Sequence, residues 1–184
     1  MPIKICVLVG SLREESYNRQ LAEGLIHLPE AREHTFAFAD IGALPLYSEE
    51  QDNDPPEAVK RLRELVRDSD AILFVTPEYN RSIPGVLKNA IDHGSRPYGQ
   101  SVWAGKPSAV IGTSIGQIGT ALAQSHLRMV LAYLDVPLMD QPEAYIQWKE
   151  GLVAQDHTIA ESSRDFLANW MSAFFTFIQR HQGG

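Results

Sequence analysis

The apolar positions along the chain form short continuous runs that alternate with segments of helical periodicity. A run that is apolar at every position is typical of a strand buried on both faces of a parallel sheet. The strand-like runs are residues 3–9, 36–39, 71–75, 108–112 and 136–139. The segments with apolar residues at helical spacing are residues 17–28, a stretch opened by Pro55 and Pro56, a stretch that follows Pro84, residues 120–134 and residues 158–180.

Strands that alternate with helices at this spacing predict an α/β fold, with a parallel sheet covered by helices on both faces. Five strands and five helices in 184 residues fit the flavodoxin-like doubly wound order 2-1-3-4-5. No repeat, low-complexity segment or linker divides the chain, so we expect one domain over residues 1–184. Ligands of such sheets bind beyond the carboxyl ends of the strands, where the strand order reverses. The loops at residues 10–18, 76–84 and 112–119 are therefore expected to form the site.

Composition narrows the classes of function. The net charge of −7 and the absence of a Lys/Arg block disfavour nucleic acid and anionic membrane as partners. The longest apolar runs, such as residues 71–75, are far shorter than the roughly 20 residues of a membrane-spanning helix. The start of the chain leads straight into a strand and lacks the pattern of a signal peptide, so we expect a cytoplasmic location. A single cysteine, Cys6, excludes an internal disulfide.

The loop after the first strand, GSLREESYN at residues 10–18, is rich in hydrogen-bond donors. Its short polar side chains and its cation are Ser11, Arg13, Ser16 and Asn18. The helix that starts near Tyr17 adds free N–H groups and the positive end of its dipole. This set of donors predicts a site for a dianionic phosphate. The structural alternative is that Ser16 is only an N-cap and Gly10 only a turn former.

Three other phosphate-related readings are disfavoured. The chain contains neither G-x-G-x-x-G nor G-x-x-x-x-G-K-[ST], the signatures of a Rossmann cradle and of a P-loop. Cys6 followed by Arg13 is compatible with a cysteine-dependent hydrolase of phosphate esters. However, Cys6 lies inside the first strand, where a thiol is usually buried packing.

The second loop, TPEYNRSIP at residues 76–84, offers a surface for a flat ring. Pro77 stiffens the exit from the strand, and Tyr79 can lie against a planar ligand. The backbone amides of residues 78–81 can reach the polar edge of a ring, and Asn80 adds a side-chain amide. A ligand with a phosphate at one end and a flat aromatic system at the other needs both loops, and FMN has that shape.

These motifs resemble those of the NADPH-dependent FMN reductase family, the flavodoxin-fold quinone, azo-dye and chromate reductases. The resemblance spans residues 3–143. It is carried by GSLRxxSYN at residues 10–18, TPEYNRSIPGVLKNAID at 76–92, the segment 103–107, TSIG at 113–116 and HLR at 126–128. It implies phosphate contacts at Ser11, Arg13, Ser16, Tyr17 and Asn18, isoalloxazine contacts at Pro77, Glu78, Tyr79, Asn80 and Arg81, and a third-loop contact at Ser114. Two positions depart from the family pattern: Arg81, where a neutral residue or Tyr is common, and His93, where an aromatic residue is common.

The resemblance implies an enzyme whose bound FMN carries the chemistry, without a catalytic side chain. NADPH or NADH would deliver a hydride to flavin N5, and a quinone, azo compound, metal oxyanion or free flavin would then take it in a ping-pong exchange. The alternative function is a flavodoxin-type electron carrier without NAD(P)H activity. The cation at Arg81 serves an anionic nucleotide partner or is simply solvated.

The resemblance also implies a dimer or tetramer. Two aromatic segments suggest an interface between subunits. One is residues 139–151. The other is the last helix, where Phe174, Phe175 and Phe177 exceed what one helix face buries. The histidines, including His93 and His126, show no metal-binding spacing and are expected at the surface or at helix ends.

Overall fold

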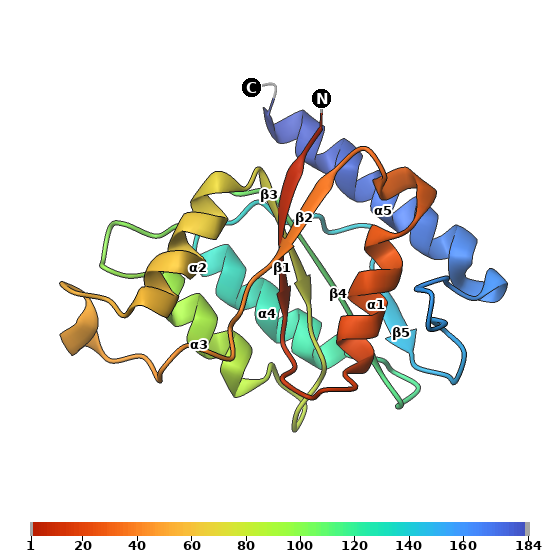
Figure 1. Ribbon diagram of the computed structural model, residues 1–184, viewed down its shortest axis with the longest axis horizontal. Coiled ribbons are helices and arrows are strands. Elements are labelled where there is room, and N and C mark those ends of the chain that lie inside the picture. The colour runs from red at the N-terminus through yellow and green to blue at the C-terminus, as the bar shows by residue number, and fades with distance from the viewer. Residues whose placement is uncertain (1, 183–184) are drawn as a thin grey trace.

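The computed structural model describes residues 2–182 and contains one five-stranded parallel sheet (Figure 1). The strands are β1 (Lys4–Val9), β2 (Thr35–Phe38), β3 (Ala71–Val75), β4 (Ser108–Ser114) and β5 (Tyr145–Gln147). The helices are α1 (Tyr17–Ile26), α2 (Glu57–Asp68), α3 (Gly85–Gly94), α4 (Ala121–Tyr133) and α5 (Glu161–Gln182), with 3-10 turns at Pro29–Ala31 and Glu49–Gln51. The strand order β2-β1-β3-β4-β5 confirms the predicted flavodoxin-like topology. None of the helices within residues 2–182 is long and apolar enough to cross a bilayer.

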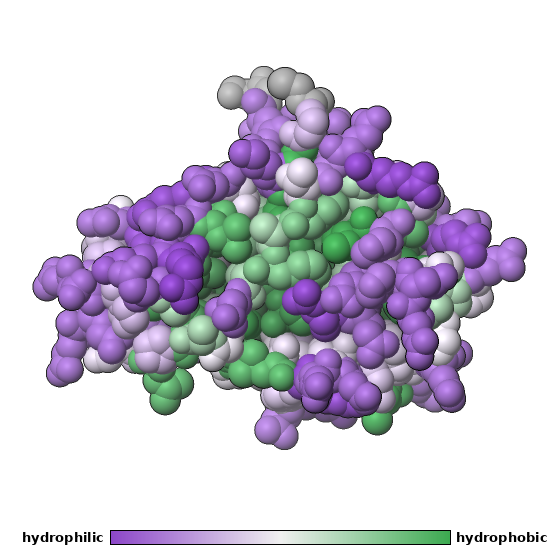
Figure 2. Space-filling model, in the orientation of Figure 1, coloured by the Kyte–Doolittle hydropathy of each residue, from purple (hydrophilic) through white to green (hydrophobic). Residues whose placement is uncertain are grey.

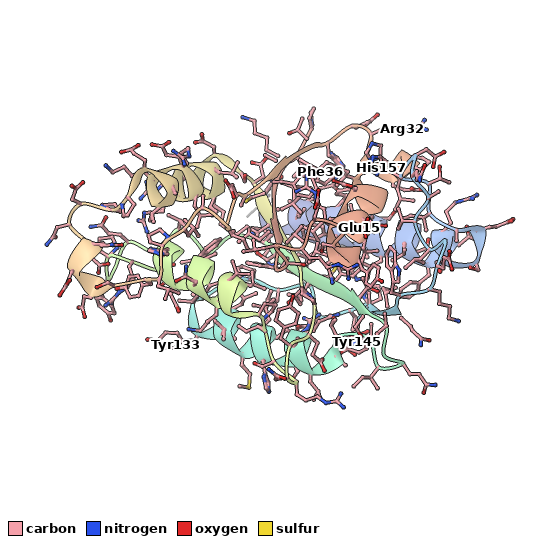
Figure 3. All side chains as sticks on the ribbon, turned by 60° about the horizontal axis from the view of Figure 1, so that its bottom comes forward. Glu15, Arg32, Phe36, Tyr133, Tyr145 and His157 are labelled. Atoms are coloured by element: carbon pink, nitrogen blue, oxygen red, sulfur yellow. The ribbon has the colours of Figure 1, made fainter. Side chains whose placement is uncertain are left out.

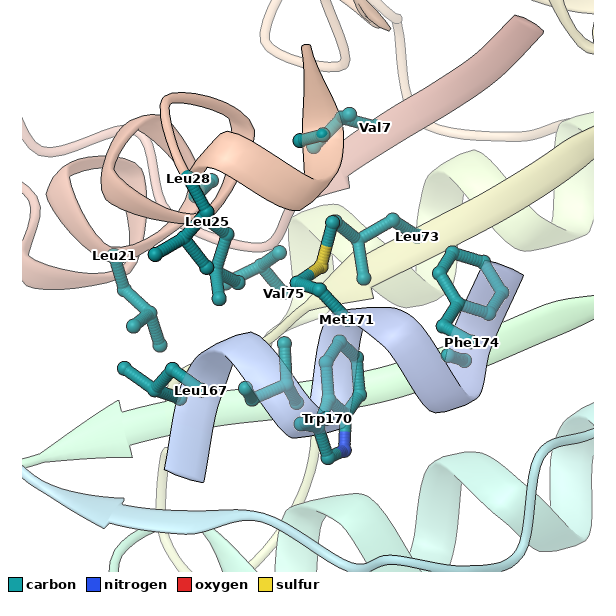
Figure 4. Close-up of a cluster of buried hydrophobic side chains, with 14 of the residues drawn as sticks. Val7, Leu21, Leu25, Leu28, Leu73, Val75, Leu167, Trp170, Met171 and Phe174 are labelled. Carbon is teal, nitrogen blue, oxygen red and sulfur yellow. The ribbon is translucent and has the colours of Figure 1, made fainter. Parts of the chain in front are cut away.

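Two apolar cores attach the helices to the two faces of the sheet. Because successive side chains of a strand point to opposite faces, Val7 of β1 enters one core while Cys6 and Leu8 enter the other. The first core is closed by α1 and α5, and the second by α2, α3 and α4. Figure 4 shows the first core, where Leu25 of α1 and Trp170 of α5 approach the strands from the helical side. The continuous apolar runs in the sequence thus reflect strands covered on both sides.

The aromatic residues of α5 belong to this first core. Phe174 and Phe175 are buried, and Phe177 packs against the same cluster. The expectation that they form surplus aromatic surface was wrong. The reason is that α5 contacts α1, β4 and the turn Pro29–Ala31, so the protein covers a wide arc of the helix.

The last strand differs from the predicted one. Residues 136–139 touch β4 only through a bridge between Leu138 and Ser108, whereas β5 pairs with β4 from Gly112 to Ser114. Pro137 and Pro142 lie in and after the expected strand, and neither has an N–H group to donate to a ladder. The edge of the sheet beside β4 is therefore made of two separate pieces.

The structure also shows the environments of Cys6 and His93. Cys6 is fully buried, and burial raises the pKa of its thiol to about 12. The thiol therefore stays protonated at neutral pH and is no nucleophile. His93 is buried at the end of α3 rather than at the surface, with its Nε2 atom 2.9 Å from the carbonyl oxygen of Pro45.

The opposite edge of the sheet is formed by β2, which pairs with β1 alone among the described strands. Figure 2 shows apolar surface over this part of the molecule. Phe36 and Phe38 are only partly buried there. The guanidinium carbon of Arg19 lies 3.7 Å from the ring centroid of Phe38, so its side chain covers part of the exposed edge.

A glycine allows β3 and β4 to approach closely where the site begins. A Cβ atom at Gly112 would overlap the carbonyl oxygen of Thr76 and the hydroxyl of Thr120. At Gly85, the first residue of α3, a Cβ atom would meet no neighbour within 4 Å among the described residues. We expect Gly112→Ala to lower the free energy of unfolding by about 1–3 kcal/mol through overpacking. Gly85→Ala should stay within about 0.5 kcal/mol of the wild type. Urea unfolding of both variants checks this, and equal effects would contradict it.

Candidate functional site

Three loops meet at the carboxyl end of the sheet: loop one (residues 10–18), loop two (residues 76–84) and loop three (residues 112–119). They lie at the bottom of Figure 1 and come forward in Figure 3. Gly10 N–H donates to the carbonyl of Val75, and Thr76 N–H donates to the carbonyl of Ile111, each at 2.9 Å. The exits of β1, β3 and β4 are therefore joined directly.

Loop one presents unused backbone donors. Among residues 2–182, no backbone carbonyl accepts a hydrogen bond from the N–H groups of residues 11–18. Ser16 is the N-cap of α1, and its Oγ atom accepts from the N–H of Arg19 at 3.2 Å. The structural reading of Ser16 as a cap is thus realised, while the preceding N–H groups are left for another acceptor.

Asn18 ties loop one to loop three. Its Oδ1 atom accepts from the N–H of Thr113 at 3.0 Å, and its Nδ2 atom donates to the carbonyl of Thr113 at 2.9 Å. Both contacts are buried, so the amide of Asn18 is already engaged by the protein. The hydroxyl of Thr113 is buried without a hydrogen-bond partner within residues 2–182. Such a group is one that a bound polar ligand can satisfy.

Arg13 lies over an aromatic pair. Its guanidinium carbon is 4.8 Å from the ring centroid of Tyr17, and that ring stacks on Trp148 with centroids 4.5 Å apart. The ion pair between Arg13 and Glu15 spans 3.9 Å between exposed side chains and is weak. The guanidinium therefore keeps most of its donors available. Trp148 was not a predicted site residue, and only the aromatic character of residues 139–151 pointed to it.

Loop two contains a tight hairpin turn. The backbones of Tyr79 and Ser82 exchange two hydrogen bonds of 3.0 Å. Asn80 and Arg81 occupy the centre of the turn with φ angles of 51° and 66°. These are the angles of a type I′ turn, which favours Asn followed by Gly. A left-handed conformation costs a residue with a side chain such as Arg81 about 1–2 kcal/mol. The turn leaves Tyr79 53% exposed.

Glu78 anchors loop two to α4. Its Oε2 atom accepts from the N–H groups of Leu122 and Ala123, both at 3.1 Å. Its Oε1 atom lies 3.5 Å from Nη1 of Arg81. The side chain of Thr120, the N-cap residue of α4, makes no capping hydrogen bond, so Glu78 supplies the cap from another loop. A carboxylate is favourable at this positive end of a helix.

Loop three is held by an internal hydrogen bond and by contacts with β5. The hydroxyl of Ser114 donates to the carbonyl of Gly119 at 2.6 Å, and Gln147 of β5 donates to the carbonyl of Ile115 at 3.2 Å. Gly119 has a φ angle of 58°, and a Cβ atom there would press against the backbone of Tyr145 and Ile146. The loop therefore returns tightly into α4.

The structure brings the sequence-predicted residues of all three loops to one end of the sheet. Buried among them are Ser16, Asn18 and Pro77, and partly buried are Ser11, Tyr17, Glu78 and Ser114. Exposed are Arg13, Tyr79, Asn80 and Arg81. A cavity of about 500 Å³ adjoins loop one on its β2 side, lined in part by Arg13, Arg19 and Asp40. The contacts of the sequence-predicted residues with a cofactor stay a prediction.

Comparison with known proteins identifies the family of the chain. The family model described as NADPH-dependent FMN reductase matches residues 3–150. The chain belongs to the NADPH-dependent FMN reductase family. A 2-hydroxy-1,4-benzoquinone reductase from Burkholderia sp. is 52% identical over 180 residues, which cover 97% of this chain and 98% of the relative. An NAD(P)H-dependent FMN reductase from Pseudomonas aeruginosa is 41% identical, with 98% of each chain covered.

Among solved structures, the reductase is similar to FerB, a flavoenzyme NAD(P)H:(acceptor) oxidoreductase from Paracoccus denitrificans. The TM-score is 0.93 at 47% identity, and the match covers 97% of this chain and 98% of that one. The protein is thus an oxidoreductase that uses FMN and NAD(P)H. Its donor set fits FMN, because the free N–H groups of loop one suit a phosphate and the exposed ring of Tyr79 suits a flat heterocycle.

The cap supplied by Glu78 can be tested without cofactor. We expect Glu78→Ala to lower the free energy of unfolding of the apoprotein by about 1–2 kcal/mol, since two N–H groups of α4 lose their acceptor. Glu78→Gln keeps an oxygen acceptor and should cost less. Glu50→Ala, at an exposed carboxylate in the turn Glu49–Gln51, serves as the control. Guanidinium unfolding provides the measurement, and a Glu78→Ala value no larger than the control would refute the cap.

Proposed function

We propose that this reductase transfers two electrons from NADPH or NADH to quinones. The nucleotide and the quinone occupy the same open face of the site in turn. FMN, when bound, supplies the chemistry, because its ring accepts a hydride and passes it on. The observation that carries the proposal is the half-exposed Tyr79, which lies at the same end of the sheet as a loop with unused backbone donors. One shared face for both substrates leads to ping-pong kinetics.

Loop one is proposed to hold the cofactor phosphate. Backbone N–H groups of residues 11–18 and the positive end of α1 supply neutral donors, and Arg13 supplies the charge. Ser11 and Ser16 add hydroxyls. Asn18 contributes by fixing the first turn of α1 to loop three, since both ends of its amide are occupied.

Loops two and three are proposed to hold the ring. Tyr79 contacts the ring, Pro77 sets the exit of the loop, and Ser114 lines the third side. The N–H groups of Asn80 and Arg81 donate to no backbone carbonyl within residues 2–182. Donors of this kind stabilise negative charge where it develops on a bound heterocycle. Neither a nucleophile nor an acid–base side chain is needed.

Quinones are the favoured acceptors. The Burkholderia relative is named for a hydroxylated benzoquinone, and it matches nearly the whole chain. A flat, open platform binds by stacking and discriminates weakly, so azo compounds, metal oxyanions and free flavin are proposed as further acceptors.

A homo-oligomer, dimer or tetramer, is also proposed. Leu122, Met129 and Tyr133 of α4 are exposed by 40%, 68% and 85%, and they follow one side of the helix. Figure 3 shows Tyr133 near one end of α4 and Tyr145 near the other. An apolar stripe of this kind that starts beside loop three is typical of a contact between subunits.

The activity has a direct test. We expect the purified protein to be yellow and to oxidise NAD(P)H only when a quinone is supplied, with parallel lines in double-reciprocal initial-rate plots. Cys6→Ser should retain this activity, because a buried, protonated thiol has no part in it. FMN-loaded protein that oxidises no NAD(P)H in the presence of a quinone would instead support the flavodoxin-type electron carrier.

The role of Arg13 is measured by cofactor affinity. A charge-assisted contact to a phosphate contributes about 1.5–3 kcal/mol, so Arg13→Ala should raise the Kd of FMN roughly tenfold or more. Fluorescence titration of the apoprotein with FMN gives the Kd. Arg180→Gln, at an exposed position near the end of α5, removes the same charge far from the loops and should leave the Kd unchanged. An unchanged Kd for Arg13→Ala would remove Arg13 from the phosphate site.

A further inference from the structure

We propose that Arg81 is a specificity-determining residue, which selects acceptors that carry a negative charge on the quinone ring. The chemical class is the ionised hydroxyquinone. This inference rests on the proposed quinone reductase function of the same face. It adds the residue that distinguishes one acceptor from another.

The first observation is the backbone of Arg81. Its φ angle of 66° places it at the second central position of the type I′ turn, where glycine is the preferred residue. The preceding residue, Asn80, is the type that this turn favours, so the turn is otherwise well formed. An arginine at the glycine position adds backbone strain and no core packing, because its side chain is 68% exposed. At a ligand-binding loop, strain of this kind motivates the hypothesis that the side chain has a function.

The second observation is the direction in which the cation is held. Nη1 of Arg81 lies 3.5 Å from Oε1 of Glu78, and the other oxygen of that carboxylate is bound to the first turn of α4. The guanidinium is therefore drawn toward the junction of loop two and α4. The carboxylate is shared with two N–H groups, and the long contact is weak, so most of the positive charge and most donors of Arg81 face outward.

The third observation concerns the other exposed residues of loop two and of α4. Tyr79, two residues earlier in the same turn, is 53% exposed and supplies an aromatic ring to the same loop. His126 of α4 is also exposed, with Nδ1 3.0 Å from the hydroxyl of Ser82. On a chain with a net charge of −7, an anion is repelled unless a local cation attracts it. The turn thus carries an exposed aromatic ring and an exposed planar cation two residues apart, and these two groups suit a flat anion.

The chemistry of the acceptor supplies such an anion. A hydroxyl group on a quinone ring is a vinylogous carboxylic acid and is ionised at neutral pH. Reduction adds two electrons and two protons, a hydride equivalent from NAD(P)H and one proton from solvent, and gives NAD(P)⁺ and the hydroquinone with its third oxygen still ionised, which then takes a further proton from solvent. Arg81 forms and breaks no covalent bond in this balance. Its guanidinium binds the oxygen substituent of the quinone ring that carries the negative charge.

The test isolates the acceptor step. FMN-loaded enzyme is reduced chemically without nicotinamide and mixed in a stopped-flow instrument with ionised 2-hydroxy-1,4-benzoquinone or with its neutral methyl ether. Rates are expressed per bound flavin, and each variant is compared with the wild type on the same acceptor, so intrinsic reactivity cancels. We expect Arg81→Gly to lower the ratio of the two rate constants about tenfold, Arg81→Lys to lower it less, and Arg180→Gln to leave it unchanged.

Folding and salt provide independent readouts. Arg81→Gly should have an unfolding temperature no lower than that of the wild type, because glycine suits the turn. The preference for the ionised quinone should weaken as ionic strength rises in the wild type but not in Arg81→Gly. Loss of both acceptors to the same extent would overturn the proposal. So would an unchanged ratio with slower reduction by NADPH, which would assign Arg81 to the nucleotide phosphates. A wild type that reduces neither quinone would instead refute the proposed function.

Discussion

The site depends on the two hydrogen bonds between the side chain of Asn18 and the backbone of Thr113. They join the first turn of α1 to the end of β4, across the position of β3. Because both groups are buried, neither hydrogen bond exchanges readily with water, and the distance between loop one and loop three is fixed. A cofactor that spans the two loops therefore meets a preformed frame rather than two independently moving segments.

Each of the other loops repeats this arrangement with different residues. Glu78 fastens loop two to the start of α4, and the hydroxyl of Ser114 closes loop three on Gly119. In each loop a side chain makes one of the structural contacts, and several backbone N–H groups of the loops donate to no backbone carbonyl within residues 2–182. Preorganised, unused donors are what an anionic cofactor requires. The rigidity of the loops and their capacity to bind thus have the same origin.

The sequence predicted the sheet order because each central strand is apolar on both faces. This pattern does not depend on how the individual side chains pack. It also located the three loops, since the topology fixes where strands end. It failed where partners are distant in the chain. The short, partly exposed β5 has no pattern of its own, and the stacking of Trp148 on Tyr17 joins residues far apart in sequence. Likewise, nothing local to Glu78 indicates that it caps a helix more than forty residues later.

In loop two, the residues that hold the loop differ from Arg81, the residue proposed to select the acceptor. The contacts that hold loop two use Glu78 and the backbones of Tyr79 and Ser82, and the side chain of Arg81 at the tip of the turn adds only its weak 3.5 Å contact with Glu78. A position of this kind can change from a neutral residue to a cation without loss of the fold, at the cost of local strain alone. Selectivity among acceptors can then vary at the tip of the turn, while the residues that hold the cofactor stay as they are.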